Sequence, residues 1–137
     1  QVSIEDAFIL YKWRLEKNTV ISSRNPPPEN FLFHTDWLKS KLMNKPLLFA
    51  IIMNSNVPVG SIRLEKIDFY KKSFEIFISI SENHQNKKIA KTSLFILKKI
   101  TPNIDIYANV LEDNKNSVKL FCNSSFIKFK KNWYKRG

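Results

Sequence analysis

The stretch from Ser73 to Ile100 constrains the fold of this chain most, because its residue pattern predicts a strand, a turn and a helix in succession. Every second residue from Phe74 to Ile80 is apolar, which is the period of a β-strand. A polar run at 81–88 follows, and apolar residues then recur at helical spacing until Pro102 ends the helix. We expect this helix to bury a stripe made of Ile89, Ser93, Ile96, Leu97 and Ile100.

The junction between this strand and this helix is a predicted phosphate-binding site. The first backbone N–H groups of a helix have no partner within it, and the helix dipole adds positive charge there. Lys87, Lys88 and Lys91 bring further positive charge to the same place. A basic turn that leads into a helix N-terminus binds phosphate groups.

Length and composition predict one globular domain spanning 1–137, because 137 residues with 43% hydrophobic content can form a single core. Only Gln1 and Val2 precede the first helical pattern, so we expect the first strand of the domain to be truncated. No apolar run approaches the roughly 20 residues of a membrane span, so we expect no membrane partner. Cys122 is the only cysteine, which excludes an internal disulfide and a Cys-rich metal site. We predict no metal, a cytoplasmic location, and a Cys122 side chain packed within its helix.

The formal net charge of +11 fits a nucleic acid, a polyphosphate cofactor or a nucleotide-linked substrate. Lysines occur in almost every segment, which favours a general positive field over a nucleic-acid footprint. The basic and aromatic residues at 128–136 are interpreted as a charged edge strand that resists aggregation. Nucleic acid is therefore not the expected partner.

The remaining pattern predicts an α+β fold with a central, mostly antiparallel sheet. The predicted helices span 4–16, 31–43 and 115–123, the strands span 46–53, 57–67, 104–110 and 126–130, and a proline-rich loop covers 18–30. In the first helix we expect Ile4, Phe8, Tyr11 and Leu15 to face the core. The strands at 73–80 and 104–110 are joined by a helix, so they are expected to be parallel. Gly60 inside its strand predicts a bulge or a close backbone contact.

Two segments resemble sequence motifs of the GNAT (GCN5-related) N-acetyltransferases. Gln85-x-x-Lys88-x-Ala90 is similar to the pyrophosphate-binding signature, Gln or Arg, x-x-Gly-x, then Gly or Ala, with Lys88 at the position of the first glycine. The run from Asn114 to Phe126 is similar to the second motif, Asn-x-x-Ser, an apolar-aromatic pair and Gly-Phe, with Ser125 in place of glycine. The resemblance implies a GNAT-like single domain with helices on both faces of the sheet.

The N-terminal part of the chain resembles one subgroup of this family. Glu5-Asp6-Ala7, Lys12-Trp13-Arg14 and His34-x-x-Trp37 are similar to the subgroup of ribosomal-protein and nucleotide-amino-sugar acetyltransferases. This subgroup implies acetyl transfer from acetyl-CoA to a primary amine, most readily on a nucleotide-linked amino sugar, by a monomer or homodimer. The alternatives are a protein N-terminal acetyltransferase, a degenerate GNAT that binds coenzyme A without turnover, and a basic nucleic-acid-binding α/β module.

The resemblance also implies residues for the acetyl-CoA site. Pantetheine is expected along the strand, the diphosphate on the turn and the remainder near the following helix. The corresponding residues are Phe77, Ile78, Ser79 and Ile80; Gln85, Asn86, Lys87, Lys88, Ile89, Ala90 and Lys91; and Asn114, Ser117 and Phe121.

Catalysis requires a base for the amine and an acid for the departing thiolate. Glu75 is the first candidate base, since it lies on the central strand close to the position of the base in some GNATs. His34, beside Asp36, is the alternative, and His84 is assigned to the surface of the turn. Phe121 stands where the family often has an acidic tyrosine, so Tyr107, Tyr134 or water would serve as the acid.

Overall fold

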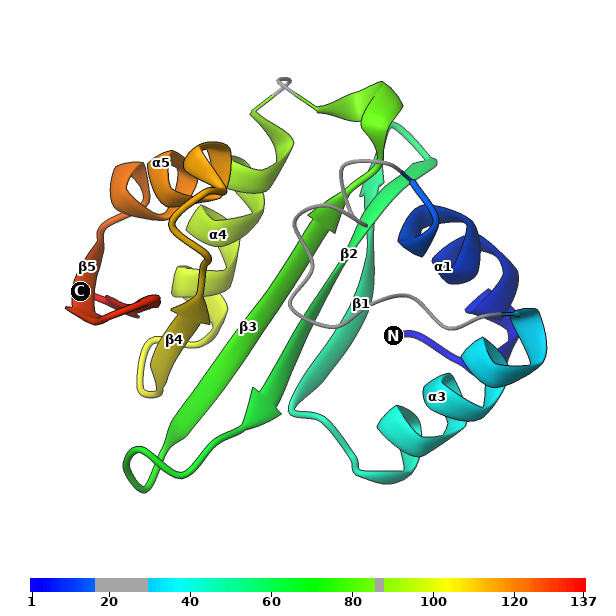
Figure 1. Cartoon of the computed structure of the whole chain (residues 1–137), viewed down its shortest axis with the longest axis horizontal. Helices are drawn as coiled ribbons and strands as arrows, with labels where there is room; N and C mark the ends of the chain where they lie inside the picture. Colours follow the sequence, from blue (N-terminus) through cyan, green and yellow to red (C-terminus); the bar gives the residue numbers. More distant parts are fainter. Residues whose placement is uncertain (17–29, 86–87) are drawn as a thin grey trace.

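The computed structural model describes residues 1–16, 30–85 and 88–137. A six-stranded sheet with the order β1-β2-β3-β4-β6-β5 forms the centre, and α-helices lie on both of its sides (Figure 1). The strands are β1 (Leu48–Asn54), β2 (Val57–Lys66), β3 (Ser73–Ile80), β4 (Asp105–Asn109), β5 (Phe126–Lys130) and β6 (Trp133–Arg136). The helices are α1 (Ala7–Arg14), α3 (Phe31–Met43), α4 (Ile89–Ile100) and α5 (Lys115–Asn123), with short 3-10 turns at Ile4–Asp6 and Glu82–His84.

The pairing of the strands confirms the predicted fold class. Strands β1, β2 and β3 form an antiparallel meander, and β3 pairs with β4 in parallel. Residues 18–29 of the predicted proline-rich loop, together with Asn86 and Lys87, lie outside the described residues. Among the helices that the structure describes, none has the length and apolar character needed to cross a membrane.

Gly60 in β2 combines both features that its position in a strand predicts. The register between β1 and β2 shifts between Ile52 and Met53, opposite Gly60, which marks a bulge. A Cβ atom at position 60 would lie 2.1 Å from the carbonyl oxygen of Ser79 on β3. Only glycine therefore allows β2 to approach β3 this closely.

Two apolar clusters hold the helices to the sheet. On one face, Ile76, Leu94, Leu97, Ile106 and Phe121 belong to a cluster that joins the sheet to α4 and α5. On the other face, a second cluster joins α1 and α3 to β1; its buried members are Val2, Ala7, Leu10, Trp13, Leu38 and Phe49. Phe74 and Ile78 in β3 also pack against this first cluster. Because side chains alternate along a strand, Glu75 and Phe77 point to the opposite face, toward α1 and α3.

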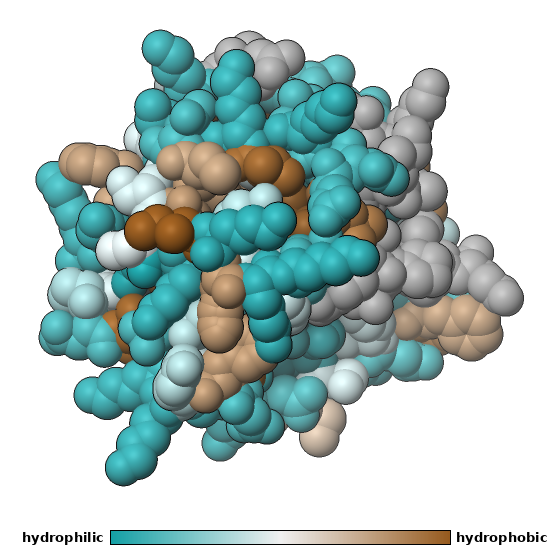
Figure 2. Space-filling model, turned by 60° about the vertical axis from the view of Figure 1, so that its left-hand side comes forward, coloured by the Kyte–Doolittle hydropathy of each residue, from teal (hydrophilic) through white to brown (hydrophobic). Residues whose placement is uncertain are grey.

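The predicted buried stripe of α1 is wrong, and that of α4 is confirmed at Leu97 but wrong at Ile96 and Ile100. In α4 the buried residues are Leu94 and Leu97, whereas Ile96 and Ile100 are 53% and 65% exposed. In α1 they are Ala7, Leu10 and Trp13, whereas Phe8 is 71% exposed. Both helices carry two apolar stripes of nearly the same spacing, and the docking angle on the sheet selects one of them. Figure 2 shows apolar patches between long hydrophilic side chains on the side where α4, α5 and β5 come forward.

The end of the chain also differs from prediction. After β5 the chain turns at Asn132, whose φ is 64°, and returns as β6 between β4 and β5. The predicted last strand, 126–130, is therefore followed by one that the pattern did not indicate. Cys122 is exposed on α5 rather than packed.

Candidate active site

The parallel pair β3 and β4 separates partway along its length. Pairing starts at Ser73 with Asp105 and ends at Glu75 with Tyr107, although β3 continues to Ile80. Beyond Tyr107, the described part of β4 pairs with β6 on its other side. Figure 1 shows β3 and β4 diverging from this point. The edge of β3 from Ile76 to Ile80, which contains all four predicted pantetheine contacts, therefore has no partner in β4.

The turn after β3 is held by side-chain and backbone hydrogen bonds. The Gln85 amide donates to the carbonyl oxygen of Ile80 at 3.0 Å. The Ser81 N–H donates to the carbonyl of Val59 at 2.8 Å, and Ser81 Oγ lies 2.7 Å from His84 Nδ1. The side chain of Gln85 thus ties the predicted diphosphate turn to the end of β3.

Lys88 adopts a left-handed backbone conformation, which glycine tolerates better than any other residue. Its φ is 59° and its ψ is 16°, in the left-handed region, at the N-cap of α4. Its side chain makes no capping hydrogen bond, so the first-turn N–H groups of Ile89, Ala90 and Lys91 receive no cap from it. Uncapped N–H groups next to lysines are the donor set that a diphosphate requires. The described part of the turn therefore fits a diphosphate group.

The second motif also has a left-handed residue at the position where the family has glycine. Ser125, where the family has glycine, has a φ of 70°. Asn114 Oδ1 accepts the N–H of Ser117 at 3.2 Å and so caps α5. Phe121 is 5% exposed and packs edge-on against Phe126 at 4.9 Å, so its ring contributes to the core.

Glu75 and Tyr107 are brought together where the strands separate. They are register partners on adjacent strands, and Glu75 is 6% exposed while Tyr107 is 0% exposed. Their neighbours Ile76 and Ile106 belong to the α4 and α5 cluster, so both side chains point to the opposite face. Among the described residues, the Tyr107 hydroxyl has no hydrogen-bond partner. A carboxylate and a buried hydroxyl thus face the same side of the opening.

Other candidate catalytic residues lie elsewhere. Tyr134 belongs to the apolar cluster on the α4 and α5 face, on the other side of the sheet from Glu75. His34 lies in α3, fully buried, stacked on Trp37 at 5.4 Å and near Tyr11 at 5.2 Å. Burial lowers the pKa of His34, and the charge of Arg14 lowers it further.

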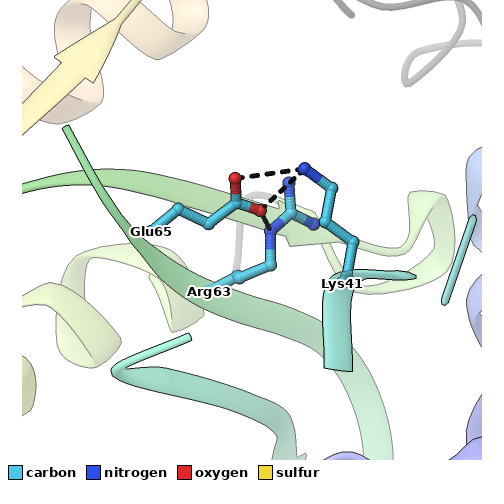
Figure 3. A network of polar contacts seen from close by, with 3 residues as sticks. All are labelled: Lys41, Arg63 and Glu65. Carbon is cyan, nitrogen blue, oxygen red and sulfur yellow. Dashed lines mark hydrogen bonds and ion pairs between the residues drawn. The ribbon is translucent and has the colours of Figure 1, made fainter. Parts of the chain in front are cut away.

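Sequence reasoning missed a basic and aromatic network on the α1 and α3 side. The Arg14 guanidinium lies 4.2 Å from the Trp37 ring centre, and that of Arg63 lies 4.1 Å from Phe77. Arg63 and Lys41 both form ion pairs with Glu65, which is the register partner of Glu75 (Figure 3). Burial lowers the pKa of Arg14, and nearby Arg63 adds to this effect. Arg14 and Trp37 belong to the two N-terminal motifs noted in the sequence, whereas the scarcity of arginine in this lysine-rich chain is the signal that marks Arg63.

Metal ligands are not gathered in the described parts of the chain. No group of three or more His, Cys, Asp or Glu side chains there could hold a metal ion. The groups that the structure does bring to the opening are Glu75, Tyr107, backbone N–H groups and the nearby cations.

Several solved structures share this fold. Spermidine N-acetyltransferase from Vibrio cholerae, in complex with CoA and spermine, matches with a TM-score of 0.79 at 16% identity, over 98% of this chain and 88% of that one. An acetyltransferase from Thermus thermophilus matches with a TM-score of 0.81 at 16% identity, over 98% and 92%. AAC(6')-Ib, in complex with paromomycin and acetyl-CoA, matches with a TM-score of 0.81 at 12% identity, over 98% and 89%.

Sequence comparison gives the family. No curated protein matches the chain. Residues 9–123 match the profile of the acetyltransferase (GNAT) family, which is most of the 137 residues. The chain therefore belongs to the GNAT family of acetyltransferases, which confirms the predicted enzyme class and acetyl-CoA cofactor.

Proposed function

We propose that this protein transfers the acetyl group of acetyl-CoA to a primary amine on a small, negatively charged acceptor, with nucleotide-linked amino sugars as the preferred class. The observation that carries the location of the site is the end of β3–β4 pairing at Glu75 and Tyr107. Beyond this point β3 offers an open edge that leads to the left-handed N-cap of α4 at Lys88. An extended thioester with a diphosphate at its far end suits such an edge.

Different groups around the opening serve as oxyanion donors, as the general base and as the general acid. Bound acetyl-CoA supplies an acetyl group that is activated as a thioester. Backbone N–H groups at the β3 edge stabilise negative charge on the carbonyl oxygen during attack. Glu75 removes a proton from the amine, directly or through a water molecule, and the Tyr107 hydroxyl donates a proton to the departing sulfur. This assignment does not use Tyr134 or His34.

The charges beside the opening favour an anionic acceptor. Arg14, Arg63 and Lys41 lie on the face to which Glu75 points, and Glu65 forms ion pairs with the last two of them. The formal net charge of +11 adds to this field. Spermine, found with the Vibrio cholerae enzyme, is a polycation that such a surface repels. A phosphate-bearing amine is attracted by the same surface.

The cofactor site is tested by calorimetry with acetyl-CoA. We expect Lys88→Glu to weaken binding about tenfold or more, because it reverses a charge beside the diphosphate. Lys98→Glu, at the exposed far end of α4, is the matched control and should leave the affinity within about twofold, since screening removes distant surface charges. Failure of the folded protein to bind acetyl-CoA would exclude the proposal.

The acceptor class is tested by CoA release with three amines. These are a UDP-linked amino sugar, spermidine and a peptide with a free N-terminus. We expect the highest kcat/KM with the UDP-linked sugar, and we expect salt to lower it, because charge attraction is screened. Higher kcat/KM with spermidine would overturn the anionic acceptor, and higher kcat/KM with the peptide would favour protein acetylation.

A further inference from the structure

A hollow of about 570 Å³ lies at the end of the sheet opposite the diphosphate turn. Its walls come from the β2–β3 turn at Tyr70, from β4 at Asp105 and Tyr107, and from β5 and β6 at Phe129 and Lys135. The volume is within the range of small-molecule sites, about 300–1,000 Å³. Figure 1 places α1 and α3 beside β1 and β2, on the other side of β3 from β4 and β5.

Aromatic rings build one side of the hollow. Phe129 stacks on Phe69 with an interplanar angle of 6° at 5.5 Å, and Tyr107 meets both rings edge-on at 5.3 and 4.8 Å. The rings brace one another, so Phe129 is held in a fixed orientation although it is 37% exposed. Tyr70, 61% exposed, adds a second ring to the lining. Exposed rings held in this way are platforms for a planar heterocycle.

Cations stand beside the rings. Lys135 Nζ lies 5.8 Å from the ring centres of both Tyr70 and Tyr107, and Lys128 also lines the hollow. The Arg136 guanidinium donates hydrogen bonds to the carbonyl oxygens of Thr101 and Ile104, so these donors do not bind a ligand in the hollow. A lysine beside an aromatic wall matches a ligand that joins a ring to phosphate.

Tyr107 supplies the observation that points to a ligand. Its side chain is fully buried and lines the hollow, and its hydroxyl has no hydrogen-bond partner among the described residues. Leaving a buried hydroxyl unpaired costs about 1–3 kcal/mol, and the proposed partner of this hydroxyl is the sulfur of the thioester, where the hollow meets the acetyl-transfer site. Tyr107 is also the register partner of Glu75, about 5 Å away between backbones. The hollow therefore shares a wall with the proposed acetyl-transfer site.

We propose that this hollow binds the nucleoside phosphate part of the acceptor. The base stacks on Phe129 and Tyr70, Lys135 binds a phosphate oxygen, and the Tyr107 end of the hollow leads toward Glu75. Asp105 accepts hydrogen bonds from ribose or base donors. The assignment rests on the proposed function, because it places the amine of the same acceptor at Glu75.

Equilibrium binding of UDP tests the hollow apart from catalysis. Calorimetry is done with the full chain saturated with CoA, so that the nucleotide cannot occupy the cofactor site. We expect UDP to bind, Lys135→Glu to weaken binding about tenfold or more, and Phe129→Ala to weaken it about fivefold or more, from lost charge pairing and stacking. Lys98→Glu carries the same charge change on α4 and should bind UDP like the parent. Thermal melts establish that each variant is folded.

The outcomes separate the hollow from the proposed function. UDP binding that falls in both hollow variants but not in Lys98→Glu supports the assignment. A protein that binds CoA but not UDP, or in which UDP binding is unchanged by both hollow variants, overturns it while leaving acetyl transfer intact. A protein that does not bind CoA overturns the proposed function, and UDP binding is then measured without CoA with the same two outcomes for the hollow.

Discussion

The two faces of the sheet differ in composition and therefore in role. The face under α4 and α5 is filled by an apolar cluster that includes Ile76, Leu97 and Ile106. The opposite face carries the buried Glu75 and the ion-paired Arg63, and its β4–β6–β5 end contains the hollow. Apolar contacts on one face hold the strands in place while the other face keeps charged groups close to the opening. Separate changes on each face should therefore affect either stability or catalysis.

The largest effect is expected on the polar face. Glu75→Gln removes the proposed base while keeping the shape of the side chain, and kcat should fall about 100-fold or more. Acetyl-CoA affinity should stay close to that of the parent, and a thermal melt establishes that the variant is folded. CoA release at saturating substrate measures the rate. Activity within threefold of the parent would exclude Glu75 as the base.

The opposite face should respond in the opposite way. Leu97 is 3% exposed in the α4 cluster, so Leu97→Ala should lower the free energy of unfolding by about 2–5 kcal/mol. Acetyl transfer by the fraction that stays folded should keep its KM for acetyl-CoA. Urea unfolding provides the stability, and Ile96→Ala on the exposed side of α4 is the control. Equal losses for the two variants would contradict the observed orientation of the helix.

A smaller effect is expected at the N-cap of α4. Lys88 has a φ of 59°, which costs a non-glycine residue about 1 kcal/mol or slightly more. Lys88→Gly should therefore raise the free energy of unfolding by up to about 1 kcal/mol, partly offset by the extra freedom of glycine in the unfolded chain. Lys91→Gly, inside the helix, should lower it instead. Destabilisation by Lys88→Gly would show that the lysine side chain has a stabilising contact.

The smallest effect is a dependence of stability on pH through His34. Burial and Arg14 lower the pKa of His34 from its ordinary 6.5 in the unfolded chain. Below that value the unfolded chain binds more protons than the folded one, so stability is lost as pH falls toward the folded pKa. His34→Phe should flatten this decline below about pH 6.5. Urea unfolding at several pH values provides the comparison, and an unchanged slope would contradict the assigned direction.

Local signals in the sequence predicted most of the elements. Alternation predicted β3 with its observed bounds, Ser73–Ile80, and helical periodicity predicted α3 as Phe31–Met43, where Asn30 caps the helix. Capping and alternation depend on neighbours within four residues, so they can be read without tertiary structure. Prediction was wrong for the buried stripe of α1 and for part of the stripe of α4, and it missed β6. Those features depend on docking angle and on pairing between distant strands.

The candidate site was predictable only in part. The turn at 85–90 and the cap at Asn114 follow from motif order, but the network of Arg14, Trp37 and Arg63 joins residues from α1, α3 and β2. The hollow likewise draws on a turn and three strands. Two motif glycines are replaced by Lys88 and Ser125, yet both positions keep a positive φ. Both residues therefore have the backbone conformation that glycine tolerates best.

Gly60 has a consequence for engineering the cofactor site. It lies on the neighbouring strand, and a Cβ there would press on the Ser79 carbonyl from behind at 2.1 Å. Since Ser79 lies on the edge of β3 that we propose binds pantetheine, any side chain at position 60 would displace backbone that the proposed site uses. Affinity for CoA analogues of different width could thus be adjusted from a residue outside the site, by a change of a single methyl group.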